Sequence, residues 1–131
     1  RMTDISAAIG REQLKKLPNF NARRREIAER YNSELSDLVI TPKNRRGHVF
    51  HQYTIRSDKR DELREFLLER KINTGIYYPS LLYTYPSMKE YQSSCPNAEI
   101  LVKEVLSLPV HPALSDSDVF EVISSIKAFF D

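Results

Sequence analysis

The feature of this sequence that most constrains its fold is the shortness of its extended segments. Apolar patterns typical of strands occur only in short runs, at 38–40, 48–56, 72–78 and 107–110. Patterns with helical periodicity lie between and around them, at 4–17, 20–35, 59–70, 98–105 and from 115 onward. Because the connectors are irregular and no regular βαβ units result, the sequence predicts an α+β fold with a small antiparallel or mixed sheet backed by helices.

Local signals predict where several helices begin and end. Thr3 or Asp4 can cap the first helix, and Pro18 is expected to separate it from the second. Asp58 is the expected cap of the helix at 59–70. A capping sequence at 115–118 opens the last helix, whose predicted apolar face comprises Val119, Val122, Ile123, Ile126 and Phe130.

The composition is that of one soluble domain, with 131 residues, 40% of them apolar and 29% charged. The 20 basic and 18 acidic residues give a net charge of only +2, which argues against a nucleic-acid-binding face. No run approaches the ~18 apolar residues of a membrane span, and the N-terminus lacks the apolar core of a signal peptide. The single cysteine, Cys95, excludes an internal disulfide, so we expect a cytoplasmic location.

Because the chain begins at Arg1 and enters a capped helix at once, we expect a fragment of a longer protein.

The histidines are the first candidates for chemistry, because imidazole titrates near neutral pH. His48 and His51 would point to opposite faces of a strand at 48–56, so they cannot share a metal, and no metal site is predicted. Two interpretations of His51 stay open. It is either a hydrogen-bonded histidine at the edge of the core or a ligand-facing one. Its expected face also carries Val49, Tyr53 and Ile55.

A basic run and a tyrosine-rich segment complete the candidates. Arg23-Arg24-Arg25 splay over about 200° on a helix, so we interpret them as a solvated helix face. The tyrosines lie in a segment broken by prolines and suit either a ligand pocket or the packing of a loop onto the core. They are Tyr77, Tyr78, Tyr83, Tyr85 and Tyr91.

Five sequence blocks, in order, make the chain resemble the DegT/DnrJ/StrS sugar aminotransferases. The first is R-M-x-x-I-x-A-A-x-G-x-x-Q-L-x-x-L, which runs from Arg1 to Leu17. The others are Arg23 to Tyr31, His51-Gln52-Tyr53-Thr54-Ile55-Arg56, Arg60-Asp61 followed by Tyr78-Pro79, and Leu106 to Pro112 followed by Leu114-Ser115-Asp116. The resemblance therefore spans essentially the whole chain. Where the family usually has His-Tyr-Pro this chain has Tyr77-Tyr78-Pro79, and Tyr83 stands where another histidine is common.

The resemblance implies the small C-terminal domain of a type I pyridoxal-phosphate enzyme. On this basis residues 1–131 are one domain, with the helix at 1–17 leading in from a missing large N-terminal domain and 18–131 forming the small domain. The Schiff-base lysine is expected outside this chain, because none of the eight lysines lies in a matching motif. The fragment is therefore expected to contain no catalytic residue, to bind no cofactor and to be inactive alone.

The resemblance also implies what the intact protein would do. It would be a homodimer that transfers an amino group from an amino acid such as glutamate to a nucleotide-linked keto-sugar, for polysaccharide or modified-sugar biosynthesis. His51, Tyr53, Tyr77 and Tyr78 are its implied substrate-binding residues, and Arg1 its implied cofactor-binding residue at a site shared across the dimer. The related dehydration, and a non-catalytic binding or regulatory module with the same fold, remain alternatives.

Overall fold

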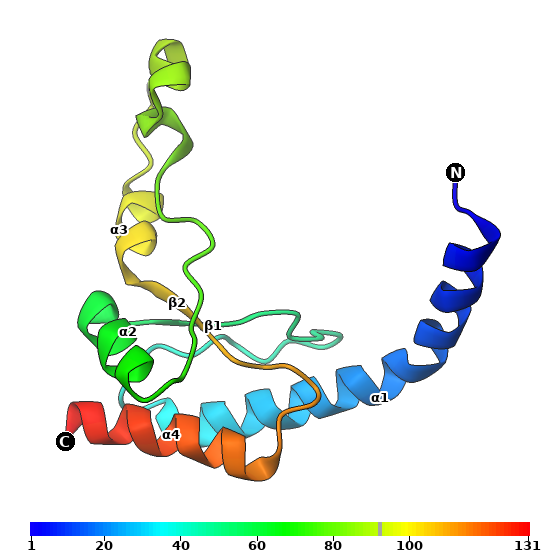
Figure 1. Ribbon diagram of the computed structural model, residues 1–131. Helices are drawn as coiled ribbons and strands as arrows, with labels where there is room; N and C mark the ends of the chain where they lie inside the picture. The colour runs from blue at the N-terminus through cyan, green and yellow to red at the C-terminus, as the bar shows by residue number, and fades with distance from the viewer. Residues whose placement is uncertain (92) are drawn as a thin grey trace.

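The α+β fold predicted from the sequence is confirmed by a computed structural model, which describes residues 1–91 and 93–131 (Figure 1). The sheet strands are β1 (Tyr53–Arg56) and β2 (Val105–Leu108). The α-helices are α1 (Asp4–Leu35), α2 (Arg60–Glu69), α3 (Pro96–Glu104) and α4 (Asp116–Phe130). Two short 3-10 helices, η1 (Leu82–Thr84) and η2 (Pro86–Tyr91), lie in an arm that extends away from the sheet.

The sheet is antiparallel. β1 and β2 pair with Tyr53 opposite Leu108, and single antiparallel bridges at Ile40 and Gly75 extend the two edges. All four short segments that the sequence predicts as extended therefore contribute to the sheet. β2 nevertheless begins at Val105, two residues before the predicted start at 107.

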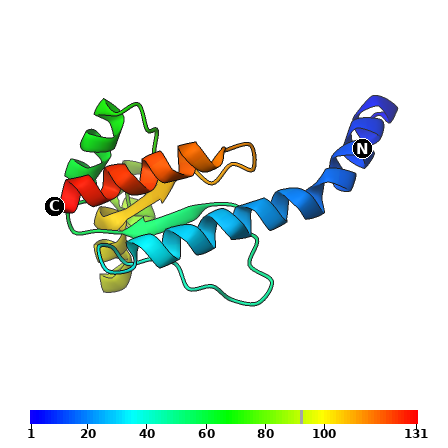
Figure 2. The ribbon, with the colours of Figure 1, turned by 90° about the horizontal axis from the view of Figure 1, so that it is seen from below.

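Helices α1 and α4 run side by side in the same direction beneath the sheet (Figures 1 and 2). Two ion pairs, Arg23 with Asp116 and Glu34 with Lys127, each join residues 93 positions apart and so fix this parallel register. α2 packs against α4 and β2. The core lies between these layers and includes Ile27, Tyr31, Leu35, Phe50, Tyr53, Ile55, Leu63, Leu67, Leu106, Val119 and Ile126.

The first helix differs from its prediction. α1 is one helix of 32 residues, so the predicted break at Pro18 is wrong. Proline removes one backbone hydrogen bond and bends a helix without necessarily ending it, and α1 is bent toward its N-terminal end (Figures 1 and 2). The cap is confirmed as Thr3, whose side chain accepts a hydrogen bond from the Ser6 amide.

The strand predicted at 48–56 is also shorter than expected. Phe50 has a φ of +47°, in the left-handed region that bulky residues seldom adopt, and regular pairing begins only at Tyr53. The Phe50 side chain is fully buried. Because Phe50 takes the core position, His51 faces solvent while Tyr53 is buried, so the prediction that these two share a face is wrong.

The ends of the remaining helices were predicted unequally well. Lys59, not Asp58, is the N-cap residue of α2, and it makes no side-chain cap hydrogen bond. α4 begins as predicted, with a capping box between Ser115 and Asp118. Val105, expected at the end of a helix, is the first residue of β2.

Candidate functional site

Four separate parts of the chain meet in a small open cavity beside β2, which we call the His51 cleft. Its volume is about 270 Å³. It is lined by Arg24, His51, Gln52, Tyr77, Ser107, Leu108, Pro109, Val110 and His111. Two of the predicted substrate-binding residues, His51 and Tyr77, are thus brought together although 26 positions separate them in the sequence.

His51 reaches the cleft because of the turn that precedes it. The Phe50 ring is anchored in the core, with its centroid 4.1 Å from the His48 ring and 6.1 Å from the Tyr53 ring. The Phe50 amide donates a hydrogen bond to His48 Nδ1 at 3.0 Å. With residue 50 directed inward, His51 is directed outward and is exposed at the mouth of the cleft.

Tyr77 is placed by the glycine two residues before it. Gly75 forms antiparallel backbone hydrogen bonds with Ser107, which hold this segment against the edge of β2. A Cβ atom at residue 75 would lie 2.9 Å from Cε2 and 3.2 Å from the hydroxyl oxygen of Tyr77. The phenol ring therefore lies across the glycine, in space that a side chain at 75 would occupy.

The loop that carries His111 is anchored to α1 on both sides. Before it, the Tyr31 hydroxyl donates to the Pro109 carbonyl at 2.9 Å, and after it Arg23 Nη2 donates to the Leu114 carbonyl at 2.9 Å. Within the loop, the Ala113 amide donates to His111 Nδ1 at 3.1 Å. These contacts fix the backbone of one wall of the cleft relative to the helix that contributes Arg24.

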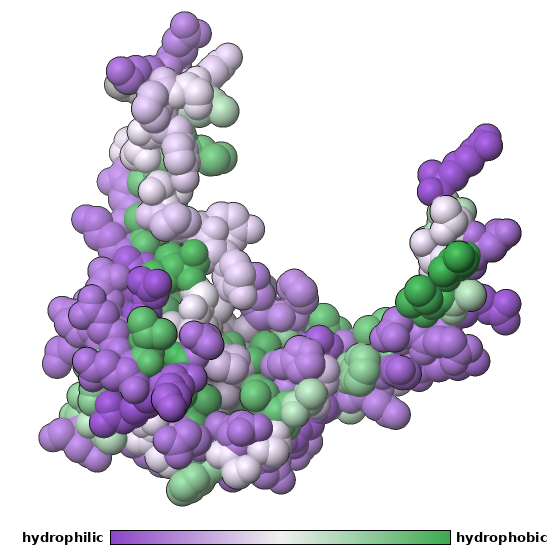
Figure 3. Space-filling model, viewed as in Figure 1, coloured by the Kyte–Doolittle hydropathy of each residue, from purple (hydrophilic) through white to green (hydrophobic). Residues whose placement is uncertain are grey.

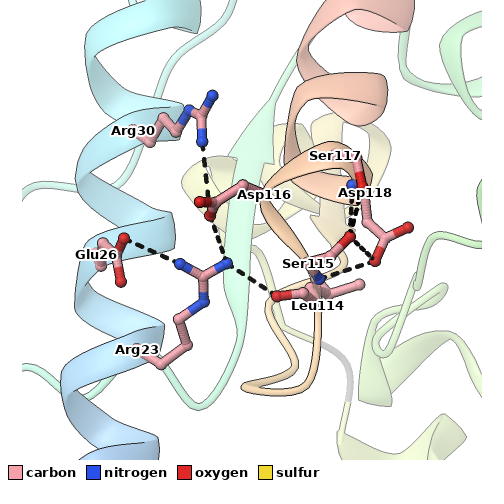
Figure 4. Close-up of polar contacts among 8 residues, drawn as sticks. All are labelled: Arg23, Glu26, Arg30, Leu114, Ser115, Asp116, Ser117 and Asp118. Atoms are coloured by element: carbon pink, nitrogen blue, oxygen red, sulfur yellow. Dashed lines mark hydrogen bonds and ion pairs between the residues drawn. The ribbon is translucent and has the colours of Figure 1, made fainter.

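Ion pairs at the start of α4 complete this anchoring (Figure 4). Arg23 pairs with Asp116 at 2.8 Å and with Glu26 at 2.9 Å, and Arg30 reaches Asp116 at 3.7 Å. The hydrogen bond from Arg23 is the main cause that holds the pKa of Asp116 below its ordinary value. Since the Asp116 side chain is 71% exposed, solvent screens this pair, and its role is chiefly to orient the loop.

Two buried tyrosines, Tyr31 and Tyr53, lie in contact with each other in the core near the cleft. The rings of Tyr31 and Tyr53 are 5.0 Å apart, and the Tyr53 hydroxyl donates to Asn32 Oδ1 at 2.6 Å. Burial raises the pKa of both phenols, so they remain protonated at neutral pH and act as hydrogen-bond donors. Tyr53 therefore belongs to the core, and its predicted contact with substrate has no support from this geometry.

The other predicted site residues do not line the cleft. Tyr78 is 77% exposed, and Arg1 is exposed at the N-terminal end of α1, far from the sheet in Figure 1. Among the remaining tyrosines, Tyr83 donates to Glu99 Oε1 at 2.7 Å. Tyr85 and Tyr91 are exposed on the arm.

The sequence analysis did not identify four polar residues of the cleft, namely Arg24, Gln52, Ser107 and His111. Arg24 belongs to the run interpreted as a solvated face, and no local pattern separates it from Arg23 or Arg25. Gln52 and His111 lie inside blocks that carry the family resemblance, and those blocks were the available signal.

The lining determines what the cleft can do. Its polar groups are a guanidinium, two imidazoles, an amide, a phenol and the Ser107 hydroxyl, and among its residues there is neither a carboxylate nor a lysine. Such a set suits binding of a polar ligand through several hydrogen bonds.

Within residues 1–91 and 93–131 there is no group of three or more histidine, cysteine, aspartate or glutamate residues that could hold a metal ion. No helix in that part of the chain has the length and apolarity to cross a membrane.

Comparison with known proteins gives one family and several similar sequences. The model of the DegT/DnrJ/EryC1/StrS aminotransferase family matches residues 1–127. A pleiotropic regulatory protein of Geobacillus stearothermophilus is 40% identical over 139 residues, a match that covers 99% of this chain and 37% of that protein. A dTDP-4-dehydro-2,3,6-trideoxy-D-glucose 4-aminotransferase of Saccharopolyspora spinosa is 38% identical over 133 residues, covering 95% of this chain and 34% of that enzyme.

Comparison with solved structures indicates the same family. The crystal structure of a DegT DnrJ EryC1 StrS aminotransferase from Brucella abortus superposes with a TM-score of 0.91 at 36% identity, over 98% of this chain and 36% of that one. The chain therefore spans about a third of the length of the relatives that it matches.

Proposed function

Because the chain belongs to the DegT/DnrJ/EryC1/StrS aminotransferase family, we propose that it forms one wall of the substrate site of a pyridoxal-phosphate-dependent nucleotide-sugar aminotransferase. The wall is the His51 cleft, with His51 and Tyr77 in contact with the keto-sugar. The observation that carries this proposal is the meeting of these two residues, distant in sequence, in one cleft rich in hydrogen-bond donors.

The substrate class rests on the relatives. One of them is named for amino transfer to a dTDP-linked deoxysugar, and it is 38% identical over 95% of this chain. Sugars are recognised through several directional hydrogen bonds and through contact with aromatic rings. Tyr77 supplies a ring and a hydroxyl, and His51 and Gln52 supply further donors and acceptors. The amino donor would be an amino acid such as glutamate, and the product would serve the synthesis of polysaccharides or other modified sugars.

The chain by itself does not fit pyridoxal phosphate. That cofactor is held by a Schiff base to a lysine, and no lysine lines the His51 cleft. We therefore assign the cofactor's lysine to the two thirds of the parent enzyme that this chain does not represent. Alone, the chain is proposed to be inactive and to hold no cofactor.

The position of Arg1 agrees with a dimeric parent. The N-terminal end of α1 lies away from the sheet, so Arg1 is free to face a second subunit (Figure 1). We assign Arg1 to the cofactor site shared across a homodimer, and we place the enzyme in the cytoplasm, where nucleotide sugars would be its substrates.

A second candidate function is a regulatory module without catalysis. It is favoured by one observation, that the relative at 40% identity is named a pleiotropic regulatory protein. The two candidates differ in whether the whole protein turns over a keto-sugar.

The test is amino transfer by the whole protein that contains this chain, with glutamate and a dTDP-linked keto-sugar as substrates. We expect transfer, and we expect Tyr77→Phe to raise the KM for the sugar about 3- to 10-fold because one hydrogen bond is lost. His51→Ala should raise it about 10-fold or more. Tyr91→Phe, on the exposed arm, is the matched control and should leave the KM unchanged. A whole protein without any transfer activity would favour the regulatory module.

A further inference from the structure

The His51 cleft contains a guanidinium for which the structure provides no carboxylate. We propose that Arg24, assisted by the His111 imidazole, forms a subsite for an oxyanion, either a carboxylate or a phosphate. This inference rests on the proposed function, because the anion would be a group of one of its substrates, but it assigns residues that the comparisons do not.

Three arginines of α1, namely Arg23, Arg24 and Arg30, differ in their side-chain partners. Arg23 pairs with Glu26 and Asp116, and Arg30 reaches Asp116. The side chain of Arg24, between them in sequence, makes no hydrogen bond or ion pair within residues 1–91 and 93–131, although Arg24 is half-buried and lines the cleft. The nearby carboxylates are thus engaged with its neighbours.

The cleft leaves this charge uncompensated. None of the nine lining residues is aspartate or glutamate, and three of them are the buried or half-buried apolar residues Leu108, Pro109 and Val110. A partly desolvated cation beside apolar walls is less well hydrated than one on an open surface. The attraction between Arg24 and an anion in the cleft would therefore be screened less by water than the same attraction on an open surface.

The geometry of the groups selects oxyanions. The guanidinium fork matches the two oxygens of a carboxylate or phosphate. His111 Nδ1 already accepts a hydrogen bond from the Ala113 amide, so the neutral imidazole carries its proton on Nε2. His111 is thereby held as a donor, which an oxyanion can use.

Two groups of the proposed substrates have this chemistry. One is the carboxylate of the amino-acid donor, and the other is the diphosphate of the nucleotide sugar. Both would place the same oxygens against Arg24 and His111, so the experiment must separate them by using one probe for each.

The test is calorimetric titration of the whole protein with glutarate, a dicarboxylate without an amino group, and separately with inorganic pyrophosphate. Arg24→Gln is compared with Arg25→Gln, the adjacent exposed arginine that does not line the cleft. We expect Arg24→Gln to weaken binding of one probe about 10-fold or more, as loss of a charged hydrogen-bond donor does. Arg25→Gln should bind like the wild type. Selective loss of glutarate assigns the subsite to the amino donor, and selective loss of pyrophosphate assigns it to the nucleotide.

Arg24→Lys is a control for misfolding, because it keeps the positive charge of residue 24 and removes only the forked guanidinium group. It should bind the affected probe with intermediate affinity and should keep the wild-type circular dichroism spectrum. Equal affinity of Arg24→Gln and Arg25→Gln for both probes would overturn the subsite, even in an enzyme that transfers amino groups normally. Conversely, loss of probe binding in Arg24→Gln without any amino transfer by the wild type would overturn the proposed function and leave the subsite standing.

Discussion

At the scale of single residues, a missing side chain determines where Tyr77 lies. Gly75 has no Cβ, and the Tyr77 ring occupies the space where that atom would be. The backbone angles at residue 75 do not require a glycine, because the φ of Gly75 is not positive. Among the glycines, Gly47 alone has a positive φ. Its role is to admit the ring, and hence to shape the mouth of the His51 cleft.

We predict that Gly75→Ala displaces the Tyr77 ring without unfolding the chain. The new methyl group would meet the ring at 2.9 Å, and the side chain can rotate away while the backbone bridge to Ser107 is kept. The KM for the keto-sugar should rise about as much as in Tyr77→Phe, by a few-fold, with an unchanged far-ultraviolet circular dichroism spectrum. Gly10→Ala is the control, since its Cβ would meet nothing within 4 Å. An unaltered KM in Gly75→Ala would show that the ring position is unimportant for binding.

At the scale of elements, α1 and α4 are joined by ion pairs whose strength depends on pH. Asp116 and Glu34 have pKa values below the ordinary 3.8 and 4.5, in each case chiefly through a side-chain hydrogen bond, from Arg23 and from Lys127. A carboxylate with a lowered pKa binds fewer protons in the folded state than in the unfolded state. Its contribution is therefore complete above the unfolded pKa and is lost as the pH falls through the folded pKa.

We predict that the stability of the chain falls as the pH drops below about 4.5 and that the double variant Asp116→Asn, Glu34→Gln shows a smaller fall. The measurement is urea denaturation over a series of pH values. Because both carboxylates are largely exposed, the difference between variant and wild type should shrink in 1 M salt, where the Debye length is about 3 Å. A difference that is independent of salt would mean that the pairs act through something other than their charges.

At the scale of the whole molecule, the chain has a packed part and an unpacked part. The N-terminal half of α1 exposes apolar side chains on a stalk that extends away from the core, green in Figure 3. They are Ile5, Ile9, Leu14 and Leu17, with Met2 exposed just before the helix begins. Burial begins in the second half of the same helix, where Ile27, Tyr31 and Leu35 are almost completely inaccessible. The predicted division at residues 17 and 18 thus stays a proposal, but one that the exposure of these side chains supports.

We predict that Ile27→Ala destabilises the chain by about 2–5 kcal/mol, as truncation of a buried isoleucine does. Ile27 is 1% exposed and Ile9 is 58% exposed in the same helix. Ile9→Ala should therefore change stability by less than about 0.5 kcal/mol. Both values come from denaturant unfolding of the two variants. Comparable losses would show that the N-terminal half of α1 is packed against something in solution.

Much of the fold follows from interactions within a few residues of each other. The apolar face and the capping box of α4 were predicted because periodicity and caps are local properties of a sequence. A small sheet of short segments, antiparallel or mixed, followed from their length and their irregular connectors, and the structure shows it to be antiparallel. The family followed from blocks of residues spread along the chain, and the match over residues 1–127 confirms it.

The sequence by itself therefore determined the fold class, the position of most helices and the family. Only the structure shows that α1 continues through Pro18, since a proline can bend a helix without ending it, and that Phe50 turns inward to join the buried core. It also decided the cleft. The sequence suggests that Arg24 is a solvated arginine. It lies beside His111 because Tyr31 and Arg23 hold the Pro109 and Leu114 carbonyls, 78 and 91 residues away, and beside His51 because β1 pairs with β2. Contacts over such separations leave no periodic signal in the sequence, since the residues become neighbours only when the chain has folded.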